Sequence, residues 1–223
     1  MKDFETTVRT RQSIRKFLPT PLTREQMHEV LTDAQWAPSA CNTQPWDVHI
    51  VSGEKLARIE EMLIQKILVE GEVKQDFDFA NELFTGKYEP RWRDQYRFVF
   101  ERAGVARGDK EARMNQTKAA FRAYGAPHVA FIFIPVVGDC VNVAADAGMY
   151  EQNFLLSLHA RGFGGVPQLS MAMHADVVRE VLGIPAEMKL LSTIAFGHLD
   201  PNANENTAHL GRIPVEESVT FHQ

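Results

Sequence analysis

The sequence predicts an α+β fold in which a single domain spans residues 1–223. Segments with the apolar spacing of helices alternate along the chain with short apolar segments typical of strands. A length of 223 residues is enough to bury a large hydrophobic core. The apolar share of 44% and the charged share of 24% are ordinary for a globular protein, which excludes collagen, coiled coils and disordered tails.

The predicted elements follow from apolar periodicity and from breaker residues. We expect helices at 2–10, 23–37, 54–69, 111–124, 139–160 and 174–182, an extended segment at 11–22, an insertion at about 70–110, and strands at 46–50, 128–136, 190–196 and 218–222.

The helix boundaries rest on capping residues. Thr23 and Gln26 form a capping-box pattern at the start of the second helix, and Pro38 ends that helix. Asp139 can cap the long helix, and Gly162 closes it. The long helix is a candidate for buried core or for a subunit contact, because it carries small residues that let another helix approach closely: Ala144, Ala145, Ala147 and Gly148.

The strands differ in how their apolar residues are spaced. Residues 46–50 alternate between apolar and polar, which predicts a half-buried strand. Residues 128–136 are apolar almost throughout, which predicts a central strand covered on both faces. Residues 218–222 alternate but have no partner nearby in sequence, so we expect them to add to an existing sheet, including one in another subunit.

The insertion at 70–110 is rich in charged and aromatic residues. Within it, Trp92, Tyr96 and Phe100 are four residues apart, so they form one stripe if the segment is helical. Such a stripe is more often core than binding site. We therefore expect a lid packed on the main body.

Composition and missing motifs exclude several classes of function. The 24 Lys and Arg residues against 29 Asp and Glu residues give a net charge of −5, which argues against a nucleic-acid binder. Cys41 and Cys140 cannot form a disulfide scaffold and fit a reducing cytoplasm. We find no secretory signal, no apolar run of ~18 residues for a membrane span and no metal-ligand spacing. Rossmann, P-loop and G-x-S-x-G motifs are also absent.

Three segments could bind a ligand. In the extended segment, Arg11, Ser13 and Arg15 point the same way, and arginine forks suit a phosphate; the alternative is a solvated basic patch. The loop at 38–46 offers hydroxyl and amide groups for the edge of a heterocycle, or it is an ordinary connection. Three glycines at 162–165 allow close approach of backbone to a ligand, or they cap a helix before a turn.

In this order and at these separations, the segments resemble the FMN-dependent nitroreductase family, over nearly the whole chain. Residues 11–17 match the family signature R-x-S-x-R/K-x-F, and residues 37–46 match A-P-S-x-x-N-x-Q-P-W. The glycine-rich turn and the run V-V-R-E-x-L-G-I-P at 177–185 match further along, and His209 and Arg212 correspond to a C-terminal arginine pair. The insertion makes the chain similar to the nitrobenzoate reductase branch.

The resemblance implies a mixed sheet flanked by helices in a homodimer that exchanges elements between subunits. It also implies FMN at two interface sites, with the loop at 38–42 reaching the flavin of the other subunit. No catalytic side chain and no metal are expected, because the flavin carries the chemistry. The implied FMN contacts are Arg11, Gln12, Ser13, Arg15, Pro38, Ser39, Ala40, Asn42, Pro167, Gln168, Leu169, Ser170, His209 and Arg212.

The implied activity is ping-pong transfer of electrons from NADH or NADPH to a small nitroaromatic such as nitrobenzoate, in the cytoplasm. The alternatives are a flavin reductase for quinones, azo compounds, enes or halogenated compounds, or a flavin-binding module without catalysis. Neither nucleic acid nor a membrane is an expected partner.

The substrate contacts predicted within the insertion are Trp92, Arg93, Tyr96 and Arg97. On a helix, Arg93 and Arg97 lie one turn apart and could pair with a substrate carboxylate. The alternative is that these arginines pair with acidic neighbours on a solvated lid.

Overall fold

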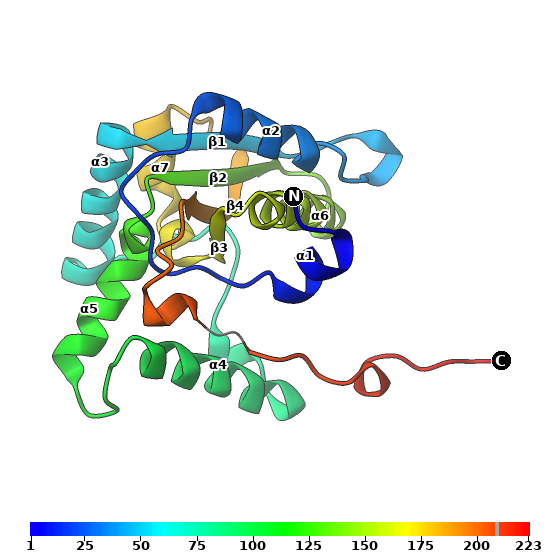
Figure 1. Ribbon diagram of the computed structural model, residues 1–223. Helices are drawn as coiled ribbons and strands as arrows, with labels where there is room; N and C mark the ends of the chain where they lie inside the picture. The colour runs from blue at the N-terminus through cyan, green and yellow to red at the C-terminus, as the bar shows by residue number, and fades with distance from the viewer. Residues whose placement is uncertain (208–209) are drawn as a thin grey trace.

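A four-stranded antiparallel sheet with the order β1-β2-β4-β3 forms the centre of the computed structural model, which describes residues 1–207 and 210–223. Helices surround the sheet and confirm the predicted α+β class (Figure 1). The strands are β1 (Asp47–Ser52), β2 (His128–Pro135), β3 (Gly164–Gln168) and β4 (Met188–Gly197). The α-helices are α1 (Phe4–Thr10), α2 (Arg24–Ala34), α3 (Gly53–Leu63), α4 (Glu89–Arg102), α5 (Lys110–Phe121), α6 (Val141–Ala160) and α7 (Ala175–Leu182).

Strand β2 is central and buried on both faces, as its apolar sequence predicts. Val129, Phe131 and Phe133 pack into one cluster with residues of α3 and α7. Ala130 and Ile132, which point the other way, pack into a second cluster with residues of α2 and α6. Because both faces are covered by helices, the sheet is the middle layer of the domain.

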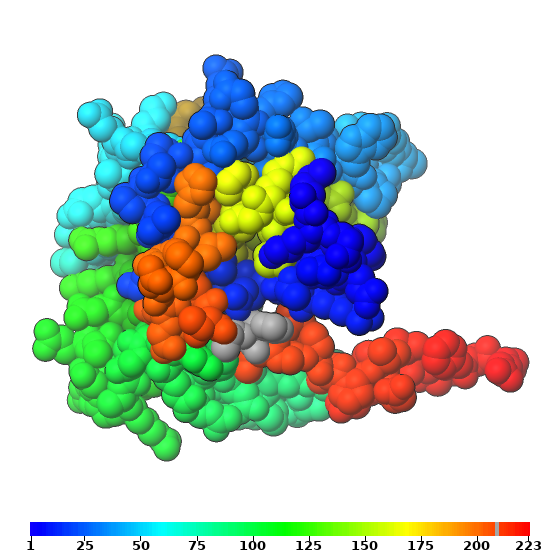
Figure 2. Space-filling model, viewed as in Figure 1, coloured from blue at the N-terminus to red at the C-terminus, as the bar shows by residue number. Residues whose placement is uncertain are grey.

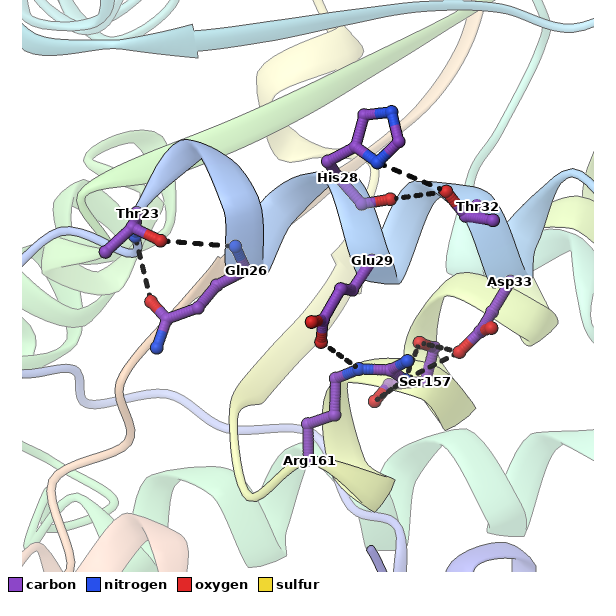
Figure 3. Close-up of polar contacts among 8 residues, drawn as sticks. All are labelled: Thr23, Gln26, His28, Glu29, Thr32, Asp33, Ser157 and Arg161. Carbon is purple, nitrogen blue, oxygen red and sulfur yellow. Dashed lines mark hydrogen bonds and ion pairs between the residues drawn. The ribbon is translucent and has the colours of Figure 1, made fainter.

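The caps predicted for two helix starts are confirmed, whereas α2 ends at Ala34 and not at the predicted residue 37. The Thr23 hydroxyl accepts a hydrogen bond from the Gln26 backbone N–H at 3.2 Å, and the Gln26 side chain accepts one from the Thr23 N–H at 2.8 Å (Figure 3). At the start of α6, Asp139 accepts from the backbone N–H of Val141 at 3.1 Å. Gly162 follows the end of α6 with a φ of +80°, a conformation that favours glycine.

A polar cluster fixes α2 against α6. Arg161 donates to Asp33 at 2.6 Å and to Glu29 at 3.2 Å, and the Ser157 hydroxyl also donates to Asp33 at 2.7 Å (Figure 3). The Arg161 side chain is only 15% exposed, so these contacts are better shielded than ordinary surface pairs. Since the loop at 37–45 follows α2, the cluster sets the position of that loop.

Two expectations about local structure are wrong. The glycine-rich segment is not a turn, because residues 164–168 pair with β4 as strand β3. The aromatic stripe is helical but not core: α4 is described throughout and buries none of its residues, and Tyr96 is 43% exposed. The spacing identifies the face of the helix that these rings share but not what that face meets.

The C-terminal residues 218–222 form no strand within the described chain. They extend away from the body beyond a short 3₁₀ turn at Val215–Glu217 (Figure 1). Among the described residues, no helix has the length and apolarity to cross a membrane, and no cluster of His, Cys, Asp and Glu could hold a metal ion.

Glu60 on α3 lies partly buried beside the end of α5. Burial raises the pKa of its carboxyl to about 7, and the charge of Arg122 offsets only part of that effect. Between the ordinary pKa of 4.5 and about 7, the folded chain therefore holds a proton that the unfolded chain has lost. Stability contributed by this group consequently falls as the pH rises through that range.

We predict that Glu60→Gln stabilises the protein at pH 8, because it removes a half-buried charge. The melting temperature should rise by about 2–4 °C, equivalent to about 1 kcal/mol in a chain of this size, and should change little at pH 4. Thermal melts at the two pH values measure this. Glu61→Gln, at an exposed position on the same helix, is the control; equal effects of both variants at pH 8 would contradict the prediction.

Candidate functional site

The extended segment at 11–18 lies along the free edge of β3. Ser13 forms a parallel bridge with Gly165, which gives the antiparallel sheet its mixed character. The Ile14 N–H donates to the Gly165 carbonyl at 3.1 Å, and the Leu18 N–H donates to the carbonyl of His198 at 2.8 Å. The predicted extended conformation is therefore confirmed, and it brings the first motif beside the third.

The glycines of β3 serve packing between chain segments. A Cβ atom at Gly164 would lie 2.9 Å from the side chain of Ile14, and one at Gly165 would lie 2.8 Å from that of Leu158. The first glycine thus admits the 11–18 segment, and the second admits helix α6. Packing therefore accounts for these two glycines without a ligand, and approach of a ligand to this backbone stays a prediction.

Arg11 and Arg212 form an arginine cluster that has no acidic partner in the part of the chain that the structure describes. Burial lowers the pKa of the Arg11 guanidinium, and the positive charge of Arg212 lowers it further. The Nη1 atom of Arg11 is buried without a hydrogen-bond partner among the described residues. Arg11 is partly buried and Arg212 is exposed, and two neighbouring positive charges suit an anion such as a phosphate.

His159 lies beside this cluster and stays neutral. Burial, together with the charges of Lys2 and Arg11, lowers its pKa to about 4. Its Nε2 atom lies 2.9 Å from the ammonium group of Lys2 and 2.8 Å from the hydroxyl of Thr10. A neutral histidine adds no further repulsion to the arginine cluster.

Asn206 holds the first motif in place, and sequence reasoning missed it. Its side chain accepts from the Arg15 N–H at 3.0 Å and donates to the Lys16 carbonyl at 2.8 Å. Its own backbone carbonyl accepts from the Gln12 side chain at 2.6 Å, which leaves the Oε1 atom of Gln12 buried and without a partner among the described residues. No local pattern around Asn206 indicates this role.

A cavity of about 740 Å³ opens next to this segment, between the end of β3, helix α5 and the insertion. Arg15, Gln168 and Ser170 line it, and so do Pro167 and Leu169. The Gln168 Oε1 atom accepts from the Ser170 hydroxyl at 3.2 Å, while its Nε2 atom is buried and unpartnered in the described part of the chain. The first and third motifs therefore share one site.

The cavity also holds groups that the sequence did not single out. Glu151 of α6 accepts a hydrogen bond from the Ser192 hydroxyl, and burial raises the pKa of its carboxyl. Burial likewise raises the pKa of Tyr124, although the nearby charge of Arg15 opposes that shift. The wall thus combines apolar surface with a few polar groups, which is typical of a small-molecule site.

The second motif does not line this cavity. Pro38, Ala40 and Asn42 are exposed, and the Ala40 N–H donates to Asp146 of α6 at 3.0 Å. The Ser39 hydroxyl accepts from the backbone of Gln44 at 2.9 Å, the local bonding expected of a connection. Asn42 has a φ of +56°, which is uncommon for a residue other than glycine. Within one chain these residues therefore stay outside the site.

The predicted substrate residues divide between two cavities. Tyr96 lines both the cavity described above and a second one, whereas Trp92, Arg93 and Arg97 line only the second. Arg93 pairs with Glu89 at 2.8 Å, and Arg97 pairs with Asp94. The alternative of acidic neighbours on a solvated helix is what the structure shows. His209 lies outside the described residues.

Comparison with known proteins places these features in a family. The model of the Nitroreductase family matches residues 8–198. The chain is 34% identical to nitroreductase NfnB of Mycolicibacterium smegmatis, over 97% of this chain and 92% of that protein. It is 26% identical to 4-nitrobenzoate reductase of Pseudomonas putida, over 94% of this chain and 91% of that one.

Solved structures agree with this. The FMN-dependent nitroreductase NfnB from Mycobacterium smegmatis in complex with NADPH superposes with a TM-score of 0.92 at 34% identity, over 98% of this chain and 97% of that one. The FMN and NADPH-dependent nitroreductase NfnB from Sphigopyxis sp. strain HMH superposes with a TM-score of 0.94 at 28% identity, and both chains are covered in full.

Proposed function

The chain belongs to the nitroreductase family, and from that premise we propose that it is an FMN-dependent oxidoreductase that passes electrons from NADPH or NADH to nitroaromatic compounds. One observation carries the cofactor assignment. Three buried polar atoms around the site have no partner among the described residues: Arg11 Nη1, Gln12 Oε1 and Gln168 Nε2. Each such atom costs roughly 1–3 kcal/mol unless a ligand pairs with it.

FMN fits these three atoms chemically. Its phosphate oxygens suit the donors of Arg11, with Arg15 and Arg212 as further cationic contacts. Its ribityl hydroxyls can donate to Gln12, and its ring carbonyls can accept from Gln168. The residues near the end of β3 thus hold the flavin ring edge, and the arginines hold the phosphate.

The side chains bind and orient, and the cofactor supplies the chemistry. When bound, FMN would supply the redox chemistry, in which a hydride from the nicotinamide donor and a proton from solvent reduce the nitro group by two electrons to a nitroso group and water. One cavity serves both partners in turn, so the nicotinamide product leaves before the nitroaromatic enters. The aromatic wall formed by Tyr96 and Phe121 offers flat surface to either ring.

Purified protein tests the activity directly. We expect a yellow protein with flavin absorbance, NADPH or NADH oxidation that depends on 4-nitrobenzoate or nitrobenzene, and parallel lines in double-reciprocal plots. A panel of quinones and azo compounds ranks the competing substrate classes. A colourless protein that gains no activity on adding FMN would refute the proposal.

The arginine cluster should control retention of the cofactor. We predict that Arg15→Ala and Arg212→Ala each weaken FMN binding by about 1.5–3 kcal/mol, as expected for charged hydrogen bonds. Arg15→Lys should also weaken it, because a two-pronged contact is lost. Fluorescence titration of the apoprotein measures this, with Arg58→Ala on the remote helix α3 as the control. Unchanged affinity in Arg15→Ala would remove Arg15 from the phosphate site.

We infer that the protein acts as a homodimer in which each subunit completes the other's site. The loop at 38–42 lies outside the cavity of its own chain, although it carries a complete family motif. On α6, Val141, Ala145 and Gly148 are exposed and share one face of the helix. The C-terminal residues form an arm that projects from the body, and Phe221 on it is 84% exposed (Figure 2). An arm with exposed Val215, Val219 and Phe221 and a helix face of small residues both suit a second copy of the chain.

Removal of residues 214–223 should therefore loosen the dimer and release FMN together. Size-exclusion chromatography with light scattering reports the mass, and absorbance reports the flavin content of the same sample. Phe221→Ser in the full-length chain is a milder variant that should show the same coupling. A truncated protein that is monomeric yet retains all of its flavin would contradict the shared site.

A further inference from the structure

The insertion encloses a second cavity of about 590 Å³, which the nitroaromatic site does not use. It lies between α4 and the start of α5, together with the turn that joins them. Tyr96 and Phe100 line both this cavity and the larger one that contains Gln168. Two rings of the aromatic stripe therefore form a wall that is common to both ligand-sized spaces.

Positively charged side chains dominate the second cavity. Arg107 and Arg113 line it and make no ion pair among the described residues, whereas Arg93 and Arg97 are already paired with carboxylates. The Arg113 guanidinium lies 4.6 Å from the centre of the Phe100 ring, which fixes it against the wall. Glu101 is the only acidic residue in the described lining, so the two unpaired arginines outnumber it.

Aromatic faces beside arginine forks are the chemistry that binds a phosphorylated adenosine. An adenine ring can stack on Trp92 or Phe100, and a phosphate can take two hydrogen bonds from a guanidinium. Arginine beside the ribose accommodates a 2′-phosphate, whereas an acidic residue favours a free 2′-hydroxyl. The described lining has two unpaired arginines, Arg107 and Arg113, and one acidic residue, Glu101. Its charge therefore favours a ribose with a 2′-phosphate over one with a free 2′-hydroxyl.

We propose that this cavity binds the adenosine 2′-phosphate end of NADPH and makes the protein prefer NADPH to NADH. The inference rests on the proposed function, because it assigns the far end of the electron donor whose nicotinamide ring enters the larger cavity. Because Tyr96 and Phe100 line both cavities, the two spaces adjoin along helix α4, and the proposal places the two ends of one extended ligand in them. The arginines on this side of the stripe thus recognise the donor rather than a carboxylate on the nitroaromatic.

A probe without nicotinamide tests binding separately from activity. Calorimetric titration of the FMN-loaded protein with adenosine 2′,5′-bisphosphate should show binding that NADPH displaces, and 5′-ADP should bind at least about tenfold more weakly. Loading with FMN keeps the probe out of the flavin phosphate site. Inorganic phosphate is the comparison that separates adenosine recognition from simple anion binding.

Substitutions then assign the residues. Arg113→Ala and Arg107→Ala should each lower the NADPH-to-NADH ratio of kcat/KM by about tenfold, mainly through KM for NADPH, and leave NADH kinetics nearly unchanged. Glu101→Gln should raise the ratio, so a gain and a loss are both expected. Arg91→Ala is the matched control on the same helix, since Arg91 pairs with Glu217 and does not line the cavity.

The outcomes separate this inference from the activity. Equal binding of adenosine 2′,5′-bisphosphate and 5′-ADP, or a ratio unchanged in both arginine variants, overturns the 2′-phosphate site while the nitroreductase activity stands. Protein that oxidises neither nicotinamide counts instead against the proposed function. Binding of inorganic phosphate with the same affinity as the adenosine probe also overturns the proposal, because the aromatic wall would then contribute nothing.

Discussion

The absence of side chains at Gly164 and Gly165 is the constraint on which the candidate site depends. Only with hydrogen at those positions can Ile14 pack on β3 while Leu158 of α6 packs on the same strand. The backbone bond from Ile14 to Gly165 then fixes the register of the 11–18 segment. As a consequence Arg15, on one side of that hydrogen bond, lines the cavity, and Arg11, on the other side, lies under the influence of the charge of Arg212.

The candidate site is positively charged, although the chain as a whole carries a net negative charge. A protein with a net charge of −5 gathers Arg11, Arg15 and Arg212 without giving any of them an acidic partner in the described residues. The repulsion between Arg11 and Arg212 disfavours this arrangement, although the exposure of Arg212 to solvent weakens it. An anionic ligand reverses the sign of that contribution, so cofactor binding and folding stability are linked. Neutral His159 keeps the repulsion from growing further.

The sequence predicts well those parts of the fold that depend on neighbouring residues, such as runs of apolar residues and helix caps. Strand β2 is recognisable because a run of apolar residues without charge is stable only in the middle of a layered domain. The cap of α2 needs only Thr23 and Gln26. Asn206 escapes detection because its bond to Arg15 joins residues 191 positions apart and lies in an irregular segment. The packing role of the two glycines escapes detection for a similar reason, since a glycine pattern does not tell whether a ligand or a distant side chain fills the space.

The insertion shows how a loosely packed segment can still have a defined place. At its base, Asp76 is 6% exposed and accepts from Arg179 at 2.5 Å and from the Leu190 N–H at 2.8 Å, which ties it to α7 and β4. Helix α4 buries none of its described residues, and its links to the rest of the chain are surface contacts such as the Asn204 side chain donating to the Arg102 carbonyl at 2.8 Å. Few buried contacts mean a low free energy of local opening. The insertion is therefore anchored to α7 and β4 through Asp76, while helix α4 can open locally. Local opening of α4 gives a ligand access to the two cavities without unfolding of the sheet.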